Sequence, residues 1–84
     1  MKSGAFFYVY ILTSCSQSER HYTGITRDLR DRLAHHNHGQ CPHTAKWRPW
    51  RIETAVAFAD NRKAARFEKY LKSASGRAFA AKHF

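Results

Sequence analysis

The sequence predicts a small α/β domain of the α+β kind, in which strands pair with one another and helices flank them. Three observations lead to this prediction. Residues 6–12 form a continuous apolar, β-prone run, residues 52–58 alternate in side-chain bulk, and residues 28–37 and 60–72 carry apolar side chains at helical spacing. A chain of 84 residues is too short for two cores, so we expect one domain over residues 1–84.

Strands are expected at residues 6–12, 20–25 and 52–58. The first is apolar on both faces and should lie in the centre of its sheet. A polar stretch separates it from the second, which favours an antiparallel hairpin. Gly24, near the end of the second strand, indicates a β-bulge or a close backbone approach.

The first helix is expected from Asp28, a residue type that caps helix N-termini, to about Asn37. Its sheet-facing positions, spaced i, i+3, i+4 and i+7, are Leu29, Arg32, Leu33 and His36. Polar side chains therefore interrupt the apolar stripe. Arg32 and His36 are one turn apart and can converge at the edge of the core.

The second helix is expected from Asp60 or Asn61 to about Lys72. Its sheet-facing positions are Ala64, Phe67, Glu68 and Leu71. A carboxylate thus occupies a core-facing position. Residues 77–84 are expected to form a short terminal helix, and residues 40–50, which contain prolines and no sustained period, a loop.

The charge balance favours a polyanionic partner such as nucleic acid. Fifteen Lys and Arg residues against six Asp and Glu residues give a net charge of +9. Charge alone is also typical of a basic protein that is merely soluble or ribosome-associated. The choice therefore depends on the motifs.

Nothing in the chain predicts a membrane segment or a disulfide-dependent fold. No apolar run approaches a spanning length, and residues 1–5 lack a signal-peptide cleavage pattern. Cys15 and Cys41 are expected as free thiols in a reducing cytosol, although only geometry can exclude a bridge between them. The histidine-rich segment 35–43 lacks paired zinc-ligand spacing. We therefore expect a cytoplasmic protein.

Glu68 has two interpretations. Among apolar neighbours its carboxylate loses hydration unless a cation compensates, and a divalent metal ion with oxygen ligands would do so. Alternatively, it forms an ion pair with Lys72 one turn later, or with Arg66 or Lys69 at the border of the stripe. Spacing alone leaves both open.

Arg32, His36 and two tyrosines also have a chemical and a structural interpretation. Arg32 could bind a scissile phosphate through its planar fork of donors, or pair with Asp28. His36 could shuttle protons near neutral pH, or be structural. Tyr10 and Tyr22 could belong to such a site, or be core aromatics with their hydroxyls at the rim.

Together these residues closely resemble the GIY-YIG nuclease superfamily, particularly its short stand-alone bacterial members related to the catalytic module of the excision-repair incision subunit. Residues 8–10 (Tyr-Val-Tyr) are similar to the first signature, and residues 22–24 (Tyr-Thr-Gly) to the second. Residues 22–37 resemble the strand-to-helix stretch of the family, and residues 67–72 its metal-binding helix. The resemblance covers nearly the whole chain.

The resemblance implies a three-stranded antiparallel sheet flanked by helices. It also implies a divalent-metal-dependent endonuclease that hydrolyses phosphodiester bonds in DNA, in repair or recombination. Tyr10 matches the tyrosine that orients or deprotonates the attacking water, Tyr22 its partner beside the phosphate, and Arg32 the catalytic arginine. His36 matches a position where members carry His or Tyr, and Glu68 the single carboxylate that binds Mg²⁺ or Mn²⁺.

The expected DNA-backbone contacts are Arg27, Arg30, Lys46 and Arg48. Family nucleases usually borrow a separate domain for specificity, so a protein partner for targeting is also implied.

The chain departs from the family pattern in three places. Tyr8 replaces the first signature glycine, Thr23 stands where isoleucine is usual, and no asparagine follows Glu68, where many members carry one. The main alternative is therefore a nucleic-acid-binding module with the same fold that is catalytically weak or inactive. A third hypothesis is a protein-interaction module that uses Trp47 and Trp50, which otherwise serve as core cover or base-stacking platforms.

Overall fold

The computed structural model describes residues 6–84. Residues 1–5, on which the expected absence of a signal peptide depends, lie outside the described residues. In chain order the elements are β1 (Phe7–Ser14), β2 (His21–Thr26), α1 (Leu29–Asn37), α2 (Pro42–Ala45), β3 (Trp50–Phe58), α3 (Asn61–Leu71) and α4 (Ala74–His83). Among residues 6–84, every helix is too short or too polar to cross a membrane.

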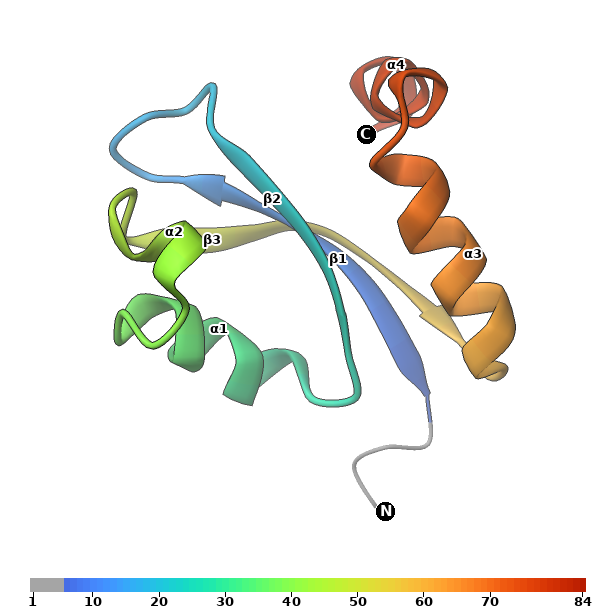
Figure 1. Cartoon of the computed structure of the whole chain (residues 1–84), viewed down its shortest axis with the longest axis horizontal. Coiled ribbons are helices and arrows are strands. Elements are labelled where there is room, and N and C mark those ends of the chain that lie inside the picture. Colours follow the sequence, from blue (N-terminus) through green and yellow to red (C-terminus); the bar gives the residue numbers. More distant parts are fainter. Residues whose placement is uncertain (1–5) are drawn as a thin grey trace.

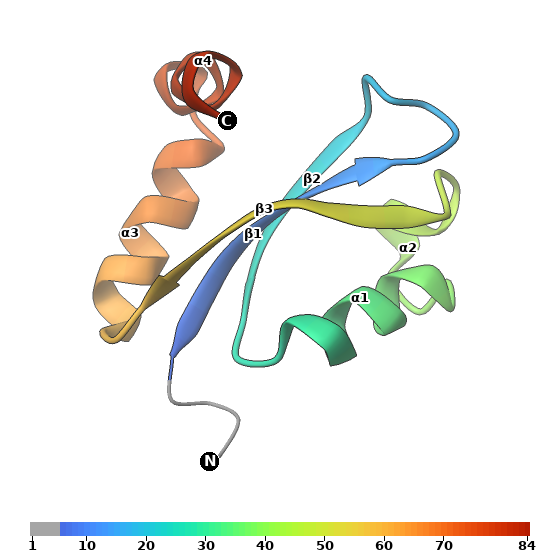
Figure 2. The ribbon, with the colours of Figure 1, turned by 180° about the vertical axis from the view of Figure 1, so that it is seen from behind.

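The strands form one antiparallel sheet in the order β2-β1-β3 (Figure 1). β1 is therefore the central strand, as its apolar sequence predicts. Helices α1 and α2 lie on one side of the sheet, and α3 and α4 lie on the other (Figures 1 and 2). The predicted three-stranded antiparallel sheet flanked by helices is confirmed.

The alternating side chains of β1 divide the core into two clusters. The cluster toward α3 comprises Val9, Ile11, Ala64 and Leu71. The cluster toward α1 and α2 comprises Tyr10, Leu12 and Trp50. The sheet thus separates an aliphatic core from a largely aromatic one, and Tyr10 belongs to the aromatic core.

Helices α2 and α4 differ from the sequence prediction, each for an identifiable reason. The expected loop at residues 40–50 contains the short helix α2, because Pro42 at its first turn suits a helix start, where N–H groups lack intrahelical partners. Helix α4 begins before the expected residues 77–84, because the Ser73 hydroxyl caps it by accepting the Gly76 N–H at 3.1 Å. Gly76 fits this close junction because a Cβ there would lie 1.8 Å from a backbone oxygen of α3.

Leu71 should contribute strongly to stability because it is 3% exposed and fills the aliphatic core beneath α3. We expect Leu71→Ala to lower the free energy of unfolding by about 2–5 kcal/mol. Lys69→Ala, an exposed position on the same helix, should change it by less than about 0.5 kcal/mol. Urea unfolding measures both variants. Equal effects would contradict the packing of α3 described above.

Candidate active site

The α1 side of the sheet brings four of the predicted site residues together. Tyr10 and Tyr22 project from β1 and β2, and their ring centroids lie 6.4 Å apart. The Asp28 side chain caps α1 by accepting the Asp31 N–H at 3.0 Å. The helix then presents Arg32 and His36, one turn apart, to the same face.

A buried chain of hydrogen bonds connects β1, α1 and α2. The Tyr10 hydroxyl lies 3.0 Å from His36 Nε2, and His36 Nδ1 lies 2.8 Å from the Thr44 hydroxyl. Each of these three side chains belongs to a residue that is 1% exposed. No water can replace these partners, so the chain must be satisfied within the protein.

The donor and acceptor roles along this chain of hydrogen bonds can be assigned. The Thr44 hydroxyl lies 3.4 Å from the Cys41 carbonyl, which can only accept a hydrogen bond. The Thr44 hydroxyl therefore donates to Cys41 and accepts the Nδ1–H of His36. His36 Nε2 is then an acceptor, and the Tyr10 hydroxyl donates to it. This arrangement requires a neutral imidazole and a protonated phenol.

The pKa values of both groups shift in the direction that this arrangement needs. Burial, assisted by the nearby Tyr22, raises the pKa of Tyr10 to about 12, although the charge of Arg32 and its hydrogen bond to the phenol act in the opposite direction. Burial, assisted by the positive charges of Arg32 and His35, lowers the pKa of His36. Both groups are therefore uncharged at neutral pH.

Gly24 makes room for the Tyr10 phenol. It lies opposite Tyr10 in the β1–β2 register, and a Cβ at Gly24 would lie 2.5 Å from the Tyr10 hydroxyl oxygen. Of the two interpretations that its position suggested, the close approach is the correct one. The register irregularity lies instead between β1 and β3, at Ile11 and Leu12.

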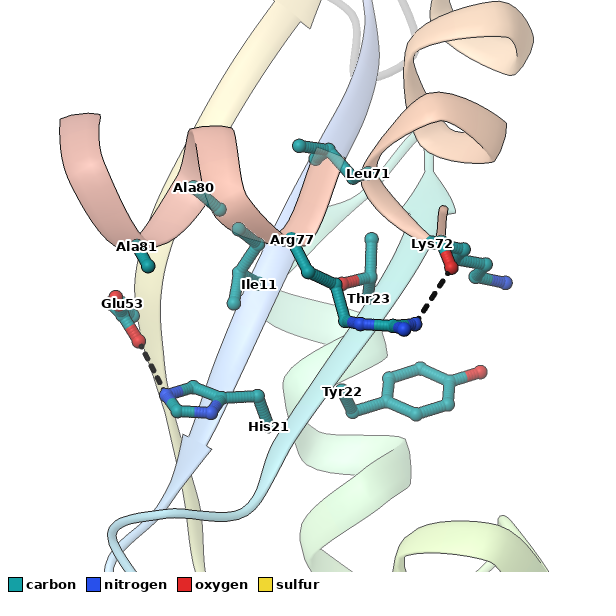
Figure 3. A pocket seen from close by; sticks show the side chains of 10 residues that line it. All are labelled: Ile11, His21, Tyr22, Thr23, Glu53, Leu71, Lys72, Arg77, Ala80 and Ala81. Atoms are coloured by element: carbon teal, nitrogen blue, oxygen red, sulfur yellow. Dashed lines mark hydrogen bonds and ion pairs between the residues drawn. The ribbon is translucent and has the colours of Figure 1, made fainter. Parts of the chain in front are cut away.

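Tyr22 occupies a different environment from Tyr10. It is half-buried on the edge strand β2, and its ring centroid lies 4.9 Å from that of His36. Tyr22 also lines a pocket together with Thr23 and Lys72 (Figure 3). One phenol is thus enclosed in the core, and the other reaches the surface.

Arg32 is half-buried at the rim of a shallow depression of about 440 Å³. Ile25 at the end of β2 and Asn61 at the start of α3 also line this depression. The Asp28 carboxylate serves as the helix cap, and within residues 6–84 it forms no ion pair with Arg32. The ion pair with Asp28 is therefore not observed. The Arg32 guanidinium instead hydrogen-bonds to the Tyr10 phenol and lines the depression.

Glu68 forms the ion pair that its spacing allowed, since its Oε2 lies 2.9 Å from Lys72 Nζ. The Glu68 side chain is 21% exposed, and α3 packs against β2. Lys72, on the same helix face, lines the pocket with Tyr22 and Thr23. Glu68 therefore lies on the α3 side of the sheet, and its partner Lys72 borders the edge strand.

The four predicted DNA-binding cations form two separate groups, and all are exposed. Arg27 and Arg30 lie at the start of α1, where the Arg27 guanidinium stacks on Phe7 at 4.8 Å. Lys46 and Arg48 lie between α2 and β3, and the Arg48 Nε donates to the Ala45 carbonyl at 2.7 Å. Both groups belong to the α1 and α2 half of the molecule.

The two tryptophans differ in role. Trp50 is 4% exposed and donates its indole N–H to the Thr44 carbonyl at 2.8 Å, so it is a core residue. Trp47 is half-buried, and the Arg20 guanidinium lies over its ring at 4.0 Å. Arg20 is a cation near the second basic group that the sequence analysis did not single out.

The comparison with protein families agrees with this geometry. A model described as the GIY-YIG catalytic domain matches residues 6–82. The chain belongs to the GIY-YIG family. Members of this family are nucleases and generally use a divalent metal ion. No curated protein sequence matches the chain closely enough to add to this finding.

The donor set of this GIY-YIG domain fits a hard cation that the protein holds through few ligands. Within residues 6–84, no group of three or more His, Cys, Asp or Glu side chains could enclose a metal ion. Mg²⁺ keeps several waters and is commonly bound by one or two carboxylates together with substrate phosphates, which suits Glu68. His36 uses both ring nitrogens in hydrogen bonds within the core.

Thr44 is a supporting residue of the GIY-YIG site that the sequence analysis missed. It lies in α2, inside the segment expected to be a loop, and it holds the His36 ring from the side opposite Tyr10. A threonine eight positions after a histidine has no helical or strand spacing that would indicate contact. Only the return of α2 against α1 brings them together.

His36 should make stability depend on pH below neutrality. The unfolded imidazole has a pKa of about 6.5, and the folded pKa is lower. Below the unfolded value the unfolded chain binds more protons, so the free energy of unfolding decreases as the pH falls through the folded pKa. We expect His36→Gln to remove this component. Urea unfolding at about pH 7 and about pH 5 measures it.

The matched control is His38→Gln, an exposed residue at the end of α1, which should retain the pH dependence of the native protein. An unchanged pH dependence in His36→Gln would contradict the neutral buried imidazole.

Proposed function

We propose that the protein is a Mg²⁺- or Mn²⁺-dependent endonuclease that hydrolyses phosphodiester bonds in DNA. The observation that carries this proposal is the placement of Tyr22, Arg32 and Glu68 along one edge strand. Tyr22 lies on β2, Arg32 shares a depression with the end of β2, and Glu68 pairs with Lys72 beside Tyr22. We infer that this phenol, guanidinium and carboxylate, which all lie near β2, act on one phosphodiester.

Arg32 binds a non-bridging oxygen of the scissile phosphate. Its planar fork of donors matches the phosphate oxygens and stabilises the additional negative charge of the transition state. Glu68 would hold the divalent ion, and its carboxylate is paired with Lys72 in the structure. When bound, the ion neutralises charge on the phosphate and on the leaving oxygen.

The two phenols have different roles. The family resemblance assigns the attacking water to Tyr10, but Tyr10 is buried, so we assign this contact to Tyr22, the phenol at the surface. Tyr10 is a positioning residue, because its hydroxyl is enclosed, donates to His36 and accepts from Arg32. Tyr10 positions the Arg32 guanidinium through their hydrogen bond. His36 orients the Tyr22 ring, which packs against it.

Binding to DNA depends mainly on phosphate contacts. Arg27, Arg30, Lys46 and Arg48 are exposed and contact the backbone, so affinity decreases steeply with salt and sequence selectivity is low. Both cysteines are free thiols, which suits a reducing compartment. We therefore propose a cytoplasmic location. The family resemblance further suggests a role in DNA repair or recombination and targeting by a protein partner.

One observation favours a second candidate function, a nucleic-acid-binding module without turnover. Lys72 neutralises the Glu68 carboxylate at 2.9 Å and competes with a metal ion for it. The chain also lacks an asparagine after Glu68. Metal-dependent cleavage separates the two candidates.

The test is cleavage of end-labelled branched and single-stranded DNA with Mg²⁺, Mn²⁺ or EDTA. We expect metal-dependent cutting that Glu68→Gln and Arg32→Ala each reduce at least about 100-fold. Glu68→Gln keeps the shape of the side chain and removes its charge. Lys69→Ala, which removes an exposed charge from the same helix, should cut like the native protein.

Cutting in EDTA, or full activity of Glu68→Gln, would contradict the proposed site. If none of the proteins cuts and all bind DNA equally, the binding module is the correct function.

A further inference from the structure

A pocket of about 400 Å³ lies between β2 and α4, next to the proposed active site (Figure 3). Its apolar lining comes from Ile11, Leu71, Ala80 and Ala81. Tyr22 and Lys72 belong both to this lining and to the edge where the proposed active site lies. One DNA strand could therefore occupy both the pocket and the proposed active site.

The end of the pocket near α3 is positively charged. Lys72 pairs with Glu68, and the Arg77 Nη1 donates to the Lys72 carbonyl at 3.0 Å. This hydrogen bond holds the Arg77 guanidinium beside the C-terminus of α3, next to Lys72 in the pocket wall (Figure 3). Arg77, together with Lys72, whose charge is shared with Glu68, suits a phosphate of the strand whose scissile group lies at Arg32.

The opposite end carries a hydrogen-bond acceptor. Glu53 lies at the register irregularity between β1 and β3, which directs its side chain to the α4 side of the sheet. His21 Nε2 lies 3.3 Å from Glu53 Oε1, and the Thr13 hydroxyl donates to the same oxygen. Both contacts use Oε1, so Oε2 keeps its lone pairs available for a donor from a ligand.

We propose that this pocket binds the base of an unpaired nucleotide in the DNA strand that is cut. The apolar lining takes the faces of the base, Glu53 accepts an N–H from its edge, and the two cations hold an adjoining phosphate. A base inside a continuous duplex must first be unstacked and unpaired, which costs free energy, so an unpaired base enters more readily. The inference rests on the proposed function and specifies its substrate class as DNA with unpaired nucleotides.

Cytosine, adenine and guanine can donate to a carboxylate through an exocyclic amino group, whereas thymine has no amino group and only its N3–H can donate. Bases that carry an amino group should therefore bind more tightly than thymine. Glu53→Gln should reduce this preference.

Binding can be tested without turnover, by amide chemical shifts of the protein in EDTA. The probes are a short single-stranded oligonucleotide whose only base is a central cytosine flanked by abasic residues, the same oligonucleotide with an abasic residue at the centre as well, and inorganic phosphate. We expect the cytosine probe to shift the amides of Thr23, Ala80 and Ala81, and the abasic probe and phosphate to leave them unchanged.

Ala81→Phe fills the pocket and should weaken cytosine-dependent binding about tenfold or more. Ala78→Phe adds the same ring to an exposed position of α4 outside the pocket lining and should bind like the native protein. Equal shifts from the abasic probe, shifts from phosphate alone, or undiminished binding by Ala81→Phe would each overturn the proposal.

The readout separates this proposal from the nuclease assignment. Pocket shifts without any cleavage would support the base pocket and contradict the nuclease function. Cleavage without pocket shifts would contradict the base pocket and support the nuclease function.

Discussion

The hydrogen bond between Tyr10 and His36 is the contact on which the rest of the site depends. It joins the central strand to α1, and Thr44 extends it to α2. A buried polar group that loses its partner costs about 1–3 kcal/mol, so these groups constrain one another strongly. Asn37 adds a second clamp, accepting the Trp50 N–H at 2.6 Å and donating to its carbonyl at 3.0 Å. Helix α1 is thereby fixed over the sheet.

This rigid layer explains how a small domain can present a site along an edge strand. Tyr22 rests against His36, and Arg32 reaches the surface from the helix that His36 anchors. Glu68 lies on the aliphatic side of the sheet, where Ala64 and Leu71 of α3 pack against β1. The proposed site lies along β2, which is an edge strand with β1 as its only neighbour in the sheet of the described residues.

Much of the fold and part of the site could be predicted from periodicity alone. Arg32, His36 and Glu68 stand out because each interrupts an apolar helical stripe, and such interruptions often mark function. Thr44 and Glu53 could not be found in this way. Thr44 lies in a helix too short to show a period, and the direction of Glu53 depends on a strand irregularity that has no sequence signal. The sequence motif contains a tyrosine at both positions. It therefore does not predict that Tyr10 is buried and that Tyr22 reaches the surface.

The most direct test compares Tyr22→Phe with Tyr10→Phe, measuring single-turnover cleavage and the free energy of unfolding for each. The account predicts that Tyr22→Phe loses about 100-fold or more in rate with little change in stability. Tyr10→Phe should lose stability by about 1–3 kcal/mol together with activity, because His36 is left without its donor. A fully stable Tyr10→Phe, or a Tyr22→Phe that cuts at the native rate, would contradict the division between a buried supporting phenol and a surface reacting one.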